Sequence, residues 1–194
     1  MTMHAHVRSR GFTLIELMVA VVVLAVLAGI ALPNFRDFTR RSAVTTEANG
    51  VLADLQYARN DAITRRIITM MCGSTNGTAC TASNAFDGGW VVYQETAPGA
   101  KATLDSADDV LRITQAKQGV SIRLVDGTGK AVTSLGFGQQ GALLGDQPLS
   151  FLVCAMSNDE SVGESLPRVQ GAQILISSSG RPMIRPIAAG GSCG

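Results

Sequence analysis

The chain has 194 residues, enough for one domain and an appendage. Its formal net charge of +1 gives no overall electrostatic argument for a polyanionic partner or an acidic substrate. Glycine is abundant, with 21 residues, and aromatic residues make up only 5%, which favours a loop-rich β domain over a helical bundle.

The N-terminal region changes abruptly from basic to apolar. Arg8 and Arg10 lie in a ten-residue start without an acid, and residues 12–33 then carry one charge, Glu16. As a helix, this segment is about 33 Å long at roughly 1.5 Å per residue, which spans a bilayer core. The preceding arginines predict a cytoplasmic N-terminus. The segment lacks a clear small-residue cleavage site of the ordinary secretory kind, and a plain anchor helix leaves Glu16 unexplained.

The residues around Glu16 form a specific motif. The run from Gly11 to Leu17, GFTLIEL, resembles the class III signal of type IV pilins and type II secretion pseudopilins. The resemblance implies that a prepilin peptidase cuts between Gly11 and Phe12 and methylates the Phe12 amine. It also implies a cleaved leader over residues 1–11, a transmembrane and filament-core helix over 12–34, and a periplasmic head over 35–194.

Glu16 is costly to place in hydrocarbon, so we expect it to have a role. In a filament it would pair with the Phe12 amine of a neighbouring subunit, where a low dielectric makes the pairing strong. Glu16 would then set the register between subunits during assembly. The alternative is a carboxylate that only reaches back to the membrane interface.

After the apolar segment, the pattern becomes amphipathic and predicts that the helix continues to about residue 66. From Phe38 to Ile63, apolar residues such as Val44, Ala48 and Leu55 recur at three- and four-residue steps and predict one apolar face. Short β signals separated by turns follow. The expected strands are 67–72, 90–94, 110–114, 120–125, 135–137, 149–156, 172–177 and 182–187. The pattern therefore predicts an α+β fold, with one long N-terminal helix packed on an antiparallel β head of one sheet or two packed sheets. The resemblance implies that this is the type IV pilin-like fold.

Four cysteines lie beyond the membrane segment, at Cys72, Cys80, Cys154 and Cys193. An even number beside a membrane-insertion signal indicates disulfides in an oxidising compartment. Three pairings are possible, and we favour Cys72–Cys80 with Cys154–Cys193. The spacings contain no CxxC pair, so they do not predict a metal site.

Further stretches narrow the resemblance to one branch. The run LQYARNDAITR at 55–65, Cys72-Gly73-Ser74, GWVVY at 89–93 and Gly180-Arg181 resemble the GspH/FimT family. This implies a low-abundance minor type IV pilin that primes or caps a pilus beside other minor and major pilins. Its place would be the inner membrane of a Gram-negative cell and then the pilus. The alternative is a GspH-like minor pseudopilin of a type II secretion system.

The sequence gives no support for an enzyme. Both histidines, His4 and His6, lie in the expected leader, so the mature chain has no histidine to act as a general base. No glycine-rich nucleotide-binding motif is present, and we expect no cofactor. Asp105, Asp108 and Asp109 read as solvated loop charges.

The C-terminal region raises a second possible function. Some FimT-type minor pilins take up DNA through a G-R-x-R motif, and this chain has Gly180-Arg181 with the next arginine at Arg185. After Glu164 there is no acid. Arg181 and Arg185, with Arg168 or Lys130, would form a small patch for non-specific contact with the phosphates of double-stranded DNA. The alternative is that these are ordinary surface arginines or contacts to a neighbouring pilin.

Overall fold

The structure is a computed structural model that describes residues 11–96, 104–105, 108–115, 117–157 and 160–194. The expected leader, except Gly11, lies outside the described residues. The chain divides into two compact units, Met1–Asp37 and Phe38–Gly194, and we call the second unit the head.

A single helix, α1 (Leu14–Arg65), runs through both units, as the amphipathic pattern predicted. It ends where Arg66 adopts a left-handed conformation with φ 58°. This conformation commonly terminates helices, although glycine usually provides it. The predicted helix end is therefore confirmed to within one residue.

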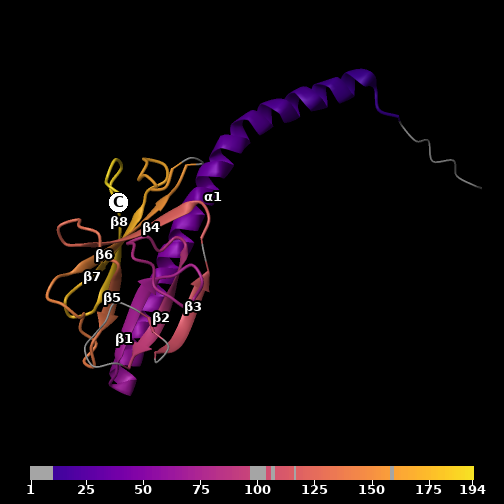
Figure 1. Cartoon of the computed structure of the whole chain (residues 1–194). Helices are drawn as coiled ribbons and strands as arrows, with labels where there is room; N and C mark the ends of the chain where they lie inside the picture. Colours follow the sequence, from indigo (N-terminus) through magenta and orange to yellow (C-terminus); the bar gives the residue numbers. More distant parts are fainter. Residues whose placement is uncertain (1–10, 97–103, 106–107, 116, 158–159) are drawn as a thin grey trace, which may run out of the picture. The chain divides into compact units, whose positions relative to one another are not determined.

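The described residues of the head form two antiparallel four-stranded sheets, which lie along the second half of α1 (Figure 1). Sheet A has the strand order β3-β2-β1-β5 and sheet B the order β4-β6-β7-β8. Their bounds agree closely with the expected strands. The strands are β1 (Ile68–Gly73), β2 (Gly89–Glu95), β3 (Asp109–Gln115), β4 (Val120–Asp126), β5 (Ser134–Phe137), β6 (Leu149–Ala155), β7 (Ala172–Ile176) and β8 (Pro182–Pro186).

The head half of α1 forms part of the same core as both sheets. Buried helix residues recur at three- or four-residue steps from Val44 through Leu55 to Ala62. They pack in one cluster with residues such as Trp90 of sheet A and Phe151 of sheet B. Full burial of side chains of this size contributes about 1.5 to 3 kcal/mol each, so this shared core holds the helix to both sheets.

Two residues expected on the apolar face of the helix do not belong to this core. Phe38 is 61% exposed and Ile63 is 41% exposed. Phe38 precedes the first buried helix residue, and Ile63 lies in the last turn. The apolar period therefore extends slightly beyond the part of the helix that the sheets cover.

The acidic residues of the head helix recur every seven residues, at Glu47, Asp54 and Asp61. Glu47 forms an ion pair with Lys117, at 3.4 Å. Asp61 accepts hydrogen bonds from Thr69 of β1 and Gln94 of β2, at 3.1 and 2.8 Å. A seven-residue spacing keeps side chains on one side of a helix. All three acids are thus directed to sheet A and the connection that follows β3.

Asp54 is the most buried of the three acids, with a relative exposure of 6%. Its carboxylate accepts hydrogen bonds from the Trp90 indole, at 2.8 Å, and the Thr114 hydroxyl, at 2.9 Å. It also pairs with Arg112, whose guanidinium lies 4.7 Å from the Tyr57 ring centroid. One buried carboxylate therefore fixes α1 to both β2 and β3.

We expect Asp54→Ala to lower the free energy of unfolding by about 2 to 4 kcal/mol, because it leaves the buried indole N–H and a charged partner without an acceptor. The measurement is urea unfolding of the full chain in detergent micelles, followed by the fluorescence of Trp90, the only tryptophan. The matched control is Glu47→Gln, which removes a more exposed ion pair on the same helix stripe and should cost less than about 1 kcal/mol. Equal losses in the two variants would contradict the assigned role of Asp54.

Candidate functional site

The start of α1 carries a hydrogen-bonded cap beside the expected cleavage point. The Glu16 backbone N–H donates to the Thr13 hydroxyl, at 3.3 Å, and the Thr13 N–H donates to the Glu16 carboxylate, at 3.4 Å. This reciprocal pair is a capping box, in which a residue of the Thr type is followed three positions later by Glu or Gln. Gly11 and Phe12 lie outside the helix, just before the cap. Glu16 thus has a local structural role that the sequence analysis missed, although the T-x-x-E spacing carries its signal.

The apolar side chains in the described part of the first unit are exposed. Phe12 is 83% exposed, and the large apolar residues from Leu14 to Leu27 are at least half exposed. This part of α1 is long and apolar enough to cross a membrane. A continuous apolar surface of this kind needs lipid or other helices around it.

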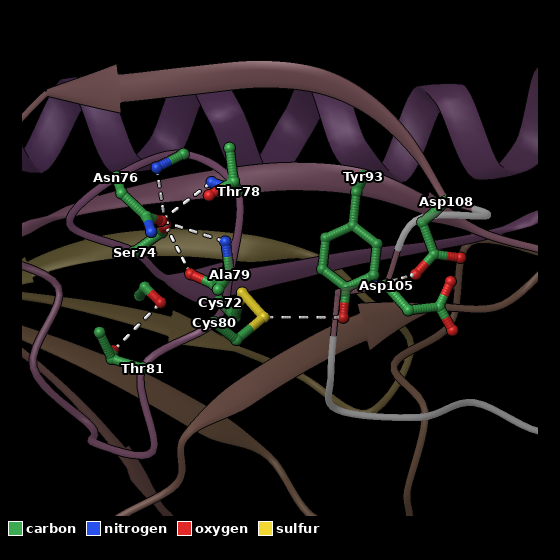
Figure 2. The surroundings of a disulfide bond; sticks show 12 residues. Cys72, Ser74, Asn76, Thr78, Ala79, Cys80, Thr81, Tyr93, Asp105 and Asp108 are labelled. Carbon is green, nitrogen blue, oxygen red and sulfur yellow. Dashed lines mark hydrogen bonds between the residues drawn. A yellow bond between two sulfur atoms is a disulfide. The ribbon is translucent and has the colours of Figure 1, made fainter.

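One disulfide, Cys72–Cys80, closes a local loop beside β1, and the sequence favoured this pair. Figure 2 shows the Tyr93 hydroxyl pointing to the Cys80 sulfur, 3.9 Å away, with Asp105 and Asp108 beyond the ring. Burial raises the pKa of Tyr93 above its ordinary value, and the charges of Glu95, Asp108 and Asp105 raise it further. The hydroxyl therefore stays protonated at neutral pH, which suits a structural role more than acid–base chemistry.

The second disulfide, Cys154–Cys193, is also the pair that the sequence favoured. It attaches the C-terminal residues to β6, and the two cysteines form a small buried cluster with Ile187. Among the described cysteines none is free. The described His, Cys, Asp and Glu residues form no group of three that could hold a metal ion.

The structure places Arg181 and Arg185 along β8, an edge strand of sheet B. Arg181 is exposed and directly precedes the strand. Arg185 is also exposed, and its Nε donates to the neutral Gln173 side chain of β7, at 2.9 Å. Within the described part of the chain, neither guanidinium has a carboxylate within ion-pair distance.

The other two residues expected in the basic patch lie elsewhere. Arg168 lines a cleft with Arg41 of α1, near Ile184 and Pro186 at the end of β8. Lys130 follows β4, which is the opposite edge of the sheet from β8 and is separated from it by β6 and β7. Three strand spacings amount to about 14 Å. The structure therefore does not bring Lys130 together with the arginines of β8.

Lys130 also has acidic surroundings. The half-buried Asp126 lies in the same turn, and its pKa is lowered by a hydrogen bond from the Thr128 hydroxyl, by backbone N–H groups and by the charge of Lys130. The two opposite charges partly offset each other, so this turn makes a poor anchor for a phosphate.

A third arginine, Arg59 of α1, lies beside Arg181, although it was not among the residues expected in the basic patch. Its Nε donates to the Gly141 carbonyl oxygen, at 2.9 Å. Gly180 is pressed against the same group with φ +77°, so that a Cβ there would overlap the Gly141 oxygen and lie 3.2 Å from the Arg59 Nε. The helix arginine and the Gly180-Arg181 turn are thus parts of one packed unit.

Two family patterns match this chain. The pattern described as "Type II transport protein GspH" matches residues 47–180, and the "Prokaryotic N-terminal methylation motif" matches residues 7–32. The first match covers most of the head and includes Arg59 and Gly180. The second covers the expected cleavage point and the apolar helix.

Individual relatives share shorter segments. A fimbrial protein of Pseudomonas aeruginosa is 46% identical over 54 residues, which are 28% of this chain and 34% of that protein. The type IV major pilin protein PilA of Myxococcus xanthus is 60% identical over 35 residues, 18% of this chain and 16% of that protein. The chain therefore matches about a third or less of the length of these relatives.

The fold is similar to that of a solved minor pilin. A crystal structure of the type IV minor pilin FimU of Pseudomonas aeruginosa superposes with a TM-score of 0.54 and 20% identity, over 77% of this chain and 92% of that chain. At this identity the likeness shows the fold, and it supports the predicted fold class.

We expect Gly180→Ala to destabilise the head more than Gly190→Ala. Both glycines have φ +77°, but a Cβ at Gly190 meets no atom within 4 Å. The left-handed conformation alone costs about 1 to 2 kcal/mol, and Gly180→Ala adds a clash with the Gly141 carbonyl. Urea unfolding of both variants measures the difference. A loss at Gly180 no greater than that at Gly190 would show that the turn can move away from α1.

The two disulfides should contribute unequally to stability because they close loops of different length. Their sequence separations are 8 and 39 residues. In the chain-entropy description, closing loops of these lengths raises the free energy of unfolding by about 2.5 and about 4 kcal/mol, respectively. Replacement of each pair by serines and urea unfolding at neutral pH give the comparison. A larger loss from removing Cys72–Cys80 would mean that local packing outweighs loop entropy.

Proposed function

The chain belongs to the GspH family of type IV minor pilins and pseudopilins, and we propose that it works as a minor pilin that primes or caps a pilus. In this role it is a structural subunit without catalytic activity. Proteins of this kind are anchored in a membrane by the N-terminal helix and then assembled into a filament. We place the anchored stage in the inner membrane, with residues 12–34 as the spanning segment and residues 35–194 on the periplasmic side.

The observation that carries this proposal is the exposed apolar surface of α1 in the described part of the first unit, with a capped start next to Gly11 and Phe12. Cleavage after Gly11 by a prepilin peptidase would leave Phe12 as the new N-terminus. The helix would then keep its cap, because both Thr13 and Glu16 belong to the mature chain. The exposed apolar side chains would exchange lipid for the helices of other pilins.

Glu16 would act in two ways in this process. Through the capping box it begins the helix close to the new N-terminus. Through its charge it would pair with the Phe12 amine of a neighbouring subunit and set the register between them. The capping role needs only an oxygen acceptor, whereas the pairing role needs a negative charge.

DNA binding is a second candidate function, and one observation favours it. Arg181 and Arg185 are exposed on the same strand edge, and neither is paired with a carboxylate among the described residues. Unneutralised arginines contact phosphates without regard to base sequence. A salt-sensitive complex between the full chain and an arbitrary duplex would test this candidate.

Variants of Glu16 test the assembly proposal and separate its two parts. Glu16→Gln retains an acceptor for the cap but removes the charge, whereas Glu16→Ala removes both. We expect both variants to be inserted and processed to the mature length, and both to be depleted at least tenfold from sheared filaments. The measurement is immunoblotting of membrane and filament fractions from cells that lack the unaltered protein. Normal incorporation of Glu16→Gln would contradict the pairing role and leave the cap.

The same cells distinguish a pilus subunit from a pseudopilin. Cells without the protein should have few or no surface pili by electron microscopy, and the unaltered chain should restore them. Unchanged piliation with a loss of protein secretion would contradict the pilus proposal in favour of a type II secretion pseudopilus.

A further inference from the structure

Arg59 and Arg181 line one cleft between α1 and β8. The cleft has a volume of about 330 Å³ and is lined by Gln56, Arg59, Asn60, Arg181 and Pro182. The three helix residues are spaced at i, i+3 and i+4 and therefore share one face. The cleft is therefore lined by two guanidinium groups and two amide side chains. None of the described residues that line it is acidic.

The Arg59 side chain is held in place before any ligand arrives. Its Nε is used by the Gly141 carbonyl at 2.9 Å, and Gly180 packs against the same bond. Within the described residues no carboxylate pairs with Arg59. A guanidinium whose Nε is anchored keeps four other N–H groups, and these can donate to an oxyanion at a small entropic cost.

The acids of the head helix do not offset this charge. Glu47, Asp54 and Asp61 form the stripe directed to sheet A, where each has partners. The face toward β8 instead presents Gln56, Asn60 and Arg59. The helix therefore separates its own charges, with the acids on one side and the uncompensated arginine on the other.

We propose that Arg59 and Arg181 form a phosphate-binding cleft at the α1–β8 edge, and that with Arg185 they make the contact between the head and the backbone of double-stranded DNA. This inference rests on the DNA-binding candidate and changes its residues. It adds Arg59 from the helix and leaves Lys130 out.

The distribution of the cations favours a phosphate polymer over a single carboxylate of a neighbouring protein. Arg181 precedes β8, Arg185 lies near its end, and Arg168 with Arg41 lines the next cleft along the strand. From Pro182 to Pro186 the strand advances about 14 Å. One DNA strand presents a phosphate every 3.4 Å or so along the axis, so about four phosphates face this length.

The test uses the full mature chain in detergent micelles and a fluorescent 30-base-pair duplex of arbitrary sequence. Anisotropy gives the Kd from about 50 to 300 mM salt, a range over which phosphate contacts weaken strongly. Gln56→Glu places a carboxylate in the cleft and leaves the Arg59–Gly141 bond untouched. We expect it to weaken binding at least tenfold. The control, Gln147→Glu, makes the same charge change at an exposed residue before β6 and should change the Kd less than twofold.

Removal of the cations gives a second readout. Arg59→Gln and Arg181→Gln should each make the negative slope of log K against log salt shallower by about 0.9, which is the value of one phosphate contact. Lys130→Gln should leave the slope unchanged. Thermal unfolding of Arg59→Gln shows whether the turn at Gly180 survives. If Arg59→Gln disrupts this turn, the effect of Gln56→Glu on the Kd alone tests the cleft.

The outcomes separate this inference from the function on which it rests. No binding of the unaltered chain at 50 mM salt would overturn both. Binding that Arg181→Gln and Arg185→Gln weaken but Gln56→Glu does not would overturn the cleft and leave DNA binding in place. A third comparison adds unlabelled duplex or polyglutamate, at equal total charge, as a competitor. If polyglutamate displaces the labelled duplex as well as unlabelled duplex does, the cleft does not prefer phosphate, and an acidic protein partner is indicated.

Discussion

The long helix α1 must satisfy two environments along one continuous backbone, and most other features follow from this constraint. The described part of its first unit exposes its large apolar side chains. Its head half instead buries a stripe from Val44 to Ala62 against two sheets. Burial of the stripe makes the head compact, whereas the uncovered part can reach a low free energy only in lipid or among other helices. The same element therefore contributes to the core of the head and, in the proposed function, to assembly.

The polar residues of the head helix are arranged around that buried stripe. Acids at seven-residue intervals turn to sheet A, and Asp54 binds β2 and β3 through the Trp90 indole, the Thr114 hydroxyl and Arg112. Because the acids are used on this side, the opposite side keeps the charge of Arg59 uncompensated. An interaction that stabilises the fold thus also creates the positive edge beside β8. The two disulfides act independently of this arrangement, since they secure a loop beside β1 and the C-terminus.

Much of the fold could be predicted because its signals are local. The period of apolar residues fixed the extent of α1, and turn residues between alternating segments located the strands within one or two positions. The processing motif is also local, since GFTLIEL is a continuous run. The capping box is equally local, because its signal is the three-residue spacing of Thr13 and Glu16. Phe38 and Ile63 were misplaced because periodicity does not reveal where the covering sheets stop.

The membrane-length helix, the α+β class, the pilin-type N-terminus and the lack of any histidine after His6 follow from the sequence alone, because each is a property of neighbouring residues. Only the tertiary structure decided which distant residues meet. Arg59 and Arg181 are far apart in the sequence, and the antiparallel pairing of β7 with β8 along α1 brings them to one cleft. Lys130 was excluded by the strand order, which puts β4 and β8 on opposite edges. Side-chain clusters of this kind depend on sheet order and register, and no local pattern encodes either of them.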